Sequence, residues 1–265
     1  MIVRPDKNSV RERFSRAAPG YDGWAEPQQR MASRLLDFLP ETPRPESILE
    51  LGCGTGLLTE RLAARWPEAR IHAVDLAPGM ISRCRKRWGS RPLVDFHVAD
   101  AESIFCTEQF DWVLSNSLFQ WIGDRPAAFR RLRGLLAPGG RMAFSVPIEG
   151  TLPELADSYL EATGEAVPTL DLWTARRYEE ALSGAAVPVE ITSVETVRVY
   201  YRNPAELLRA LKGIGATLAG QQEFPHLSPA RTRRLLDACR RRFGESDGRV
   251  PCTYRVLYAL SEAVL

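Results

Sequence analysis

The stretch Glu50-Leu51-Gly52-Cys53-Gly54-Thr55-Gly56 decides how this chain folds. It follows the apolar run Ser47-Ile48-Leu49, which predicts a strand, and it precedes an amphipathic helix expected at Leu57–Trp66. A strand that turns through three glycines into a helix is typical of a nucleotide-binding turn. Glycine has no Cβ atom, so a ligand can approach the backbone closely, and the helix N-terminus offers free N–H groups.

The composition limits the function classes that remain. The chain has 265 residues, of which 45% are hydrophobic, enough for one domain with a full core. Its formal net charge of +2 argues against a general nucleic-acid binder. The polar N-terminus and the lack of a long apolar run indicate neither a secretory signal nor a membrane span. Five scattered cysteines without a C-x-x-C pair, and three histidines, favour reduced thiols in a cytoplasmic protein with no metal site.

Strands and helices alternate through the first half of the chain. Strands are expected at 48–51, 70–75, 94–99, 110–115 and 141–146, and helices at 57–66, 78–88 and 127–136, the last stopped by Pro138-Gly139-Gly140. Such βαβ alternation predicts an α/β fold with a parallel sheet covered by helices on both faces. The segment from Asn8 to about Phe38 also reads as helical.

The pattern changes after Pro147. A helix at 152–163 opens an insertion that runs to about Pro188, and a long β-rich run covers 189–201. Helices are expected at 204–218 and 229–243, before a final strand at 253–260. A pair of helices therefore lies between two late strands within a single domain of residues 1–265.

Polar residues fall at the ends of successive predicted strands, where open α/β sheets bind ligands. Each alone reads equally well as a turn or helix-cap residue, but together they favour a cofactor site. The G-x-G-x-G spacing after an acidic residue resembles motif I of class I S-adenosylmethionine (SAM) methyltransferases. NAD would need a seat for its pyrophosphate, whereas an acidic rim suits the cationic SAM. The candidate SAM-binding residues are Glu50, Gly52, Gly54, Gly56, Asp75, Leu76, Met80, Asp100, Ala101 and Ser115.

Each group suits a part of this ligand. Glu50 can orient the glycine turn or meet the ammonium of the methionine end, and Asp75 can accept both ribose hydroxyls. Asp100 can accept the adenine amine. Leu76 and Met80 can sandwich the adenine, although core packing explains them as well.

Five segments extend the resemblance over nearly the whole chain. The opening Phe14-Ser15-Arg16-Ala17-Ala18-Pro19-Gly20-Tyr21-Asp22, with Ala25 and Gln28, is similar to that of malonyl-acyl-carrier-protein O-methyltransferases of biotin synthesis. So are the segments 110–121, 150–155 (Gly-Thr-Leu-Pro-Glu-Leu), 211–216 and 253–258. This resemblance implies a Rossmann-like sheet of seven strands with an antiparallel last strand. It also implies an N-terminal helical lid at 1–40 and helical caps at 150–188 and 203–250.

The implied reaction is methylation by SAM of the free carboxylate of a malonyl thioester. That carboxylate is ionised at neutral pH, so positioning and desolvation suffice and no general base is needed. The residues expected at the reacting centre are Tyr21, Asn116, Gln120 and Trp121. Tyr21 would contact the methionine end of SAM, with ordinary helix packing as the competing interpretation. Three other readings stay open: a methyltransferase of free small acids such as trans-aconitate, a non-catalytic SAM-binding protein, and an RNA methyltransferase.

Arginines are the expected partners of the substrate and its carrier. A buried carboxylate favours an arginine fork, for which the candidates are Arg125, Arg176, Arg177, Arg202, Arg209 and Lys212; Arg202 and Arg209 are preferred because their segment would roof the site. The predicted helix 229–243 has six arginines against one aspartate, a net charge of +5. It is a solvated face, a nucleic-acid patch or a dock for an acidic acyl carrier protein. The docking hypothesis, with malonyl-coenzyme A as the alternative substrate, rests on Arg233, Arg234 and Arg241.

Overall fold

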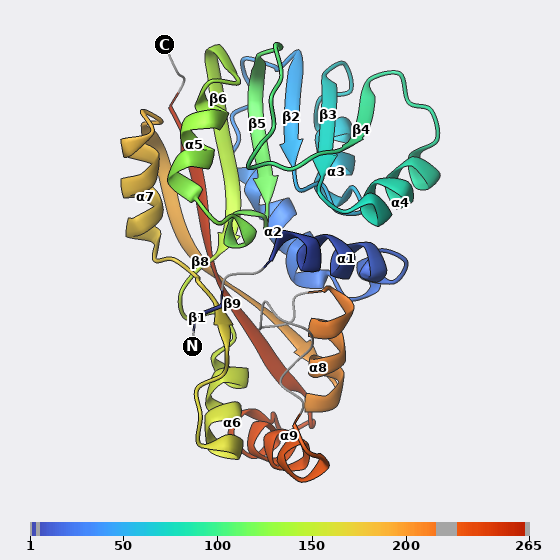
Figure 1. Cartoon of the computed structure of the whole chain (residues 1–265), viewed down its shortest axis with the longest axis vertical. Coiled ribbons are helices and arrows are strands. Elements are labelled where there is room, and N and C mark those ends of the chain that lie inside the picture. The colour runs from blue at the N-terminus through green and yellow to red at the C-terminus, as the bar shows by residue number, and fades with distance from the viewer. Residues whose placement is uncertain (1, 4–5, 216–226, 263–265) are drawn as a thin grey trace.

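The computed structural model describes residues 2–3, 6–215 and 227–262. Its centre is a seven-stranded sheet with the strand order β4-β3-β2-β5-β6-β9-β8 (Figure 1). Five neighbouring strands run parallel, and β9 runs antiparallel to β6 and β8, which confirms the expected antiparallel last strand. The strands are β2 (Ser47–Leu51), β3 (Arg70–Asp75), β4 (Val94–Val98), β5 (Phe110–Asn116), β6 (Leu136–Pro147), β8 (Val189–Tyr201) and β9 (Val250–Ser261). A separate parallel pair joins β1 (Ile2–Val3) to β7 (Thr169–Leu170).

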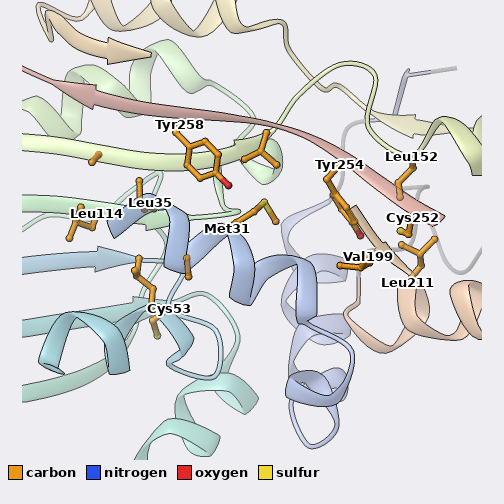
Figure 2. Packing of buried hydrophobic residues seen from close by; sticks show 14 of the residues in the cluster. Met31, Leu35, Cys53, Leu114, Leu152, Val199, Leu211, Cys252, Tyr254 and Tyr258 are labelled. Atoms are coloured by element: carbon orange, nitrogen blue, oxygen red, sulfur yellow. The ribbon is translucent and has the colours of Figure 1, made fainter. Parts of the chain in front are cut away.

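Helices cover both faces of this sheet, as the sequence predicts. Strand β2 carries apolar side chains on both faces, as is typical of an interior strand in the parallel part of a sheet. Its Ile48 packs in one buried cluster with α2 (Glu26–Asp37), α3 (Leu57–Arg65) and α4 (Pro78–Trp88), part of which is seen in Figure 2. Its Leu49 packs in a second cluster with α5 (Arg125–Arg133) and α7 (Ala175–Gly184).

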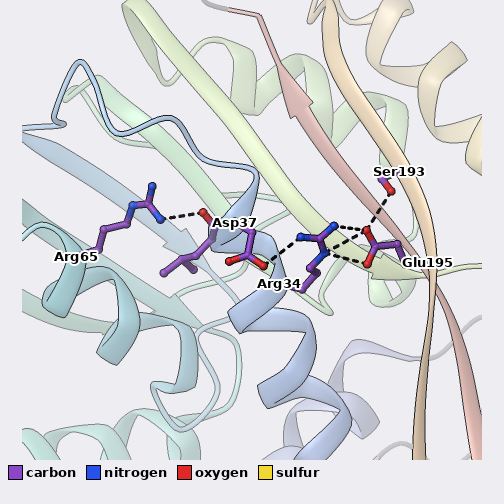
Figure 3. Close-up of polar contacts among 6 residues, drawn as sticks. Arg34, Asp37, Arg65, Ser193 and Glu195 are labelled. Carbon is purple, nitrogen blue, oxygen red and sulfur yellow. Dashed lines mark hydrogen bonds and ion pairs between the residues drawn. The ribbon is translucent and has the colours of Figure 1, made fainter.

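Helix α2 belongs to the core. Its Met31 and Leu35 are fully buried and lie beside Leu114 and Tyr258 of the sheet (Figure 2). On its outer side, Arg34 forms a 2.6 Å ion pair with Glu195 of β8 (Figure 3). The N-terminal segment therefore has two roles. Its α2 is part of the core, whereas α1 (Lys7–Ala17) and the short 3-10 helix η1 (Tyr21–Gly23) cover the strand ends.

The long strands β8 and β9 extend beyond their neighbours and carry a second helical layer (Figure 1). There α6 (Pro153–Thr163) packs on α9 (Pro229–Phe243), and α8 (Pro204–Gly213) contacts α9 and both strands. Leu152, Val199, Leu211 and Cys252 fill the space between them (Figure 2). Segment 150–188 thus divides, because its α7 packs instead against α5 and β8.

Several predicted boundaries were wrong. The helix expected at 127–136 ends at Arg133, and β6 begins at Leu136, so Pro138-Gly139-Gly140 lies inside a strand. Glycine is required there, since a Cβ atom on Gly140 would lie 2.7 Å from the carbonyl oxygen of Phe110. The helix expected from 8 to 38 is interrupted between α1 and α2 by η1. β4 ends one residue early, β9 starts three residues early, and α8 ends at Gly213, with 216–218 of the expected helix outside the described residues.

Candidate active site

The glycine turn leaves β2 in a conformation that suits glycine. Gly52, Gly54 and Gly56 have φ values of 67°, 56° and 88°, in the left-handed region that other residues rarely adopt. A Cβ atom on Gly52 would lie 3.0 Å from Leu118, whereas one on Gly54 would meet nothing within 4 Å. The backbone at Gly54 is therefore open to a ligand, and its N–H donates to Asp75 at 2.9 Å.

A pocket with an empty volume of about 780 Å³ lies over this turn and the carboxyl ends of β2, β3 and β5. It is lined by ten residues that the sequence singles out: Tyr21, Gly52, Gly54, Asp75, Leu76, Met80, Asp100, Ala101, Asn116 and Trp121. A smaller adjoining pocket of about 300 Å³ is lined by Glu50, with Gln28, Tyr21 and Asn116 among its neighbours. The structure thus brings together predicted residues as far apart in the chain as Tyr21 and Trp121.

Two strand-end aspartates hold the rim of the larger pocket. Asp75 accepts the N–H groups of Gly54 and Ala77 at 2.9 and 2.8 Å, and burial nevertheless raises its pKa. Asp100 accepts a hydrogen bond from the Nζ of Lys7 at 2.6 Å, and Lys7 also forms an ion pair with Glu102. The aspartate expected to meet adenine is therefore already tied to the first turn of α1.

Glu50 is a buried carboxyl. It lies where the sequence predicts that the methionine end of SAM binds. Burial raises its pKa to about 8, against the opposing effect of hydrogen bonds from Thr59, whose hydroxyl donates at 2.6 Å. Gln28 lines the same small pocket, although the sequence analysis assigned it only to the N-terminal lid of residues 1–40. The residue is 7% exposed, and its Oε1 has no hydrogen-bond partner among the described residues. Carboxyl and amide oxygen together would suit an ammonium group.

Helices α1 and η1, the covering segment, are held over the pocket by specific contacts. Phe14 of α1 meets the ring of Trp121 edge-on at 5.3 Å, and Phe14 and Tyr21 pack against Met80 of α4. Asp22 of η1 accepts the hydroxyl of Thr55 and lies 3.7 Å from Arg87. Burial, with Asp75 and Asp22 nearby, raises the pKa of Tyr21, so its phenol stays protonated at any physiological pH.

Asn116 is held rigidly between two elements. Its side-chain amide donates to the carbonyl oxygen of Gln28 at 3.1 Å, and its oxygen accepts the hydroxyl of Ser145 at 2.5 Å. It therefore links α2 to β6 at the floor of the site.

Other predicted residues line neither pocket. Gly56 caps α3 against Trp88 and Cys84, Ser115 is buried in β5, and Gln120 donates to the carbonyl of Ser117. Arg202 is 84% exposed and pairs with Glu206, and Arg209 is exposed on α8. Arg125, Arg176 and Arg177 have partners elsewhere, which are Asp171 for the first and third and Glu180 for the second. The structure brings none of these to the pocket wall.

Sequence reasoning missed part of the pocket wall. Lys7, Val10 and Arg11 of α1, and Ser117, Leu118 and Ile122 after β5, also line the larger pocket. The family-like Phe14 was a signal for α1, but nothing in the sequence identifies which face of that helix turns inward.

The lining suits SAM better than a pyrophosphate. Asp75, Asp100, Glu102 and Glu50 give the two pockets more acidic groups than the cations Lys7 and Arg11. No histidine of the described residues lines either pocket, and Glu50, the carboxyl with the raised pKa, lines only the smaller one. In residues 2–3, 6–215 and 227–262, no helix is long and apolar enough to cross a bilayer, and no cluster of three or more His, Cys, Asp or Glu could hold a metal.

Comparisons with known proteins agree with this geometry. Residues 48–140 match a family model described as a methyltransferase domain. A malonyl-[acyl-carrier protein] O-methyltransferase of Geobacter sulfurreducens is 37% identical over 270 residues, covering 97% of this chain and 99% of that protein. One of Halorhodospira halophila is 35% identical over 260 residues, covering 96% and 86%. The N-methyltransferase NodS of Bradyrhizobium japonicum, solved with S-adenosylhomocysteine, shares the fold, with 18% identity, a TM-score of 0.54 and coverage of 96% and 98%.

Fold and site together define a class I SAM-dependent methyltransferase, an enzyme whose methyl donor is SAM. Within that class, the chain belongs to the malonyl-[acyl-carrier protein] O-methyltransferase family, since these two relatives are 35% and 37% identical to it and are covered to 86% and 99% of their length.

Proposed function

We propose that this enzyme transfers the methyl group of SAM to the free carboxylate of a malonyl thioester on acyl carrier protein, in biotin synthesis. The observation that carries the proposal is the 35% and 37% sequence identity, over 96% and 97% of this chain, to enzymes of that name. The pocket supports it, because an ionised carboxylate needs no base and none of the described histidines lines the pocket. The rival substrate, a free small dicarboxylate, would need the same chemistry.

The residues of the chain would act by binding and by excluding water. When bound, SAM supplies an electrophilic methyl group on a sulfonium. Glu50 and Gln28 would hold the ammonium, Asp75 the ribose hydroxyls and Leu76 with Met80 the adenine. Tyr21, Phe14 and Trp121 would close the pocket over the reacting groups, which favours desolvation of the carboxylate. Asn116 would keep the floor fixed, so that donor and acceptor meet in one geometry.

Labelled methyl transfer tests the proposal directly. We expect incubation with labelled SAM and malonyl-carrier protein to give a base-labile methyl ester on the carrier. Malonyl-coenzyme A should react less efficiently, and malonate and trans-aconitate at least 100-fold less. Faster methylation of a free acid than of malonyl-carrier protein would assign the enzyme to the rival substrate class.

We further propose that α9 docks the acidic carrier. Two of its arginines are already committed, since Arg241 pairs with Glu161 and Arg242 with Asp157 of α6. Arg233 and Arg234 are exposed and make no ion pair with any described residue. Arg231 and Arg240 are likewise exposed without an ion pair to a described residue, so the proposed docking surface includes the adjacent pair Arg233 and Arg234 at its middle. Arg241 contributes chiefly to holding α9 on α6.

Charge reversal on α9 should weaken recognition of the carrier without affecting chemistry. We expect Arg233→Glu/Arg234→Glu to raise the KM for malonyl-carrier protein about tenfold at low salt, with kcat and the KM for malonyl-coenzyme A unchanged. The wild-type KM for the carrier should also rise with ionic strength. The matched control is Arg130→Glu/Arg131→Glu, an exposed pair on α5. Equal effects of both double variants would show that only net charge matters.

A further inference from the structure

Arg125 is a buried cation that lies behind the pocket wall. Its side chain is 3% exposed at the first turn of α5. Its Nε donates to the carbonyl oxygen of Phe119 at 2.7 Å, and its Nη2 donates to those of Gln120 at 3.2 Å and Asp171 at 2.8 Å. Its Cζ atom also lies over the Trp173 ring, 4.5 Å from the ring centre. Its Nε and Nη2 are committed to backbone carbonyls and its Nη1 lies 3.5 Å from the carboxylate of Asp171, so this buried fork does not face a substrate carboxylate.

A buried charge is costly unless its partners compensate it, and an apolar side chain of similar volume is often at least as stabilising. Here the compensation is incomplete, because Arg125 reaches only the carboxylate of Asp171, at 3.5 Å, which it shares with Arg177 at 3.7 Å. Three of the four polar contacts are to backbone carbonyls. Such contacts fix the chain path more than they balance charge, which points to a geometric role.

The backbone that Arg125 holds is the 3-10 turn η2 (Phe119–Trp121). One side of this turn faces Arg125 through the carbonyls of Phe119 and Gln120. The other side presents Trp121 to the pocket, where its ring meets Phe14 edge-on at 5.3 Å. Phe14 lies in α1, the helix that covers the pocket. A short chain of contacts therefore runs from Arg125 through η2 and Trp121 to helix α1.

We propose that Arg125 is a positioning residue for the methyl-transfer site. By holding the carbonyls of Phe119 and Gln120, it sets the orientation in which Trp121 supports α1 over the bound donor. The inference rests on the proposal that this pocket holds SAM. A turn of three residues has few hydrogen bonds of its own, so an external brace decides how firmly it is held.

Arg125→Lys tests this role, because lysine keeps the charge but loses the planar fork. We expect the variant to raise the Kd for S-adenosylhomocysteine and the KM for SAM about tenfold, with kcat changed less than twofold. Amide hydrogen exchange of residues 7–17 in the ligand complex should become faster. The matched control is Arg177→Lys, which contacts the same Trp173 ring and the same Asp171 but not η2. It should leave all these quantities within twofold of wild type.

A double-variant cycle separates positioning from general destabilisation. In a Trp121→Ala background, Arg125→Lys should change the Kd less than twofold, because the element through which it acts is gone. A full tenfold effect in that background, or an equal effect of Arg177→Lys, would overturn the inference. If S-adenosylhomocysteine fails to protect residues 7–17 even in the wild-type enzyme, the proposed SAM site itself is wrong. Protection in the wild type with unchanged Arg125→Lys refutes only the role of Arg125.

Discussion

Glu50→Gln should weaken SAM binding about 100-fold while making the ligand-free enzyme more stable at pH 8 and above. The loss of affinity follows because the neutral amide leaves the buried ammonium of SAM without a compensating charge, which costs about 3 kcal/mol, or 100-fold in Kd. The hydroxyl of Thr59, which donates to Glu50 at 2.6 Å, can still donate to the glutamine oxygen, so the local fold should persist.

The gain in stability has a definite pH window. Burial raises the pKa of Glu50 from 4.5 in the unfolded chain to about 8 in the folded enzyme. The folded state therefore binds this proton more tightly, so the carboxyl contributes stability below pH 4.5 that is lost as the pH rises to about 8. Glutamine has no proton to lose. The difference in unfolding free energy between variant and wild type should grow across this window and then level off.

Denaturant unfolding from pH 5 to 9, with calorimetric titration of S-adenosylhomocysteine, checks both effects. The control is Glu68→Gln, the same substitution at an exposed position after α3, which should change neither. A difference in stability that does not vary with pH would refute the raised pKa. Unchanged affinity in Glu50→Gln would remove this carboxyl from the ammonium site.

Gly79→Ala should displace helix α1 from the pocket, although alanine is the better helix former. Gly79 lies in the first turn of α4, and its Cβ atom would fall 2.5 Å from the carbonyl oxygen of Ser15. Backbone cannot move aside as a flexible side chain can, so α1 must shift away from α4. Overpacking of this kind costs about 1–3 kcal/mol. Since α1 lines the pocket, we expect the Kd for S-adenosylhomocysteine to rise at least tenfold.

The matched control is Gly184→Ala at the end of α7, where a Cβ atom would meet nothing within 4 Å. It should raise the melting temperature slightly or leave it unchanged, and leave ligand affinity as in the wild type. Melting curves and titrations of both variants decide the matter. Wild-type affinity in Gly79→Ala would mean that α1 does not cover the ligand.

The sequence was sufficient for the sheet and the glycine turn because both depend on local pattern. The apolar runs of β2 and β5, and the acidic residues at successive strand ends, could be read without tertiary information. The start of β6 could not, because Leu136 belongs to a strand only through its pairing with Phe110. The family resemblance, rather than periodicity, identified the N-terminal segment as a cover.

Contacts between distant residues were beyond the sequence. Lys7 reaches Asp100 across 93 positions, Arg34 reaches Glu195 across 161, and Arg241 reaches Glu161 across 80. Exposed arginines in a helix look alike in sequence, so only the position of α6 reveals that Arg241 is committed and Arg233 is not. Arg125 was a reasonable candidate for a carboxylate ligand until its three carbonyl partners were known.

A crystal structure with S-adenosylhomocysteine tests the central claim most directly. We predict density in the larger pocket, with the ribose beside Asp75, the adenine near Asp100, and the amino-acid end directed to Glu50 and Gln28 over Gly54. Density at another place in the fold, or an empty pocket under saturating ligand, would contradict the account.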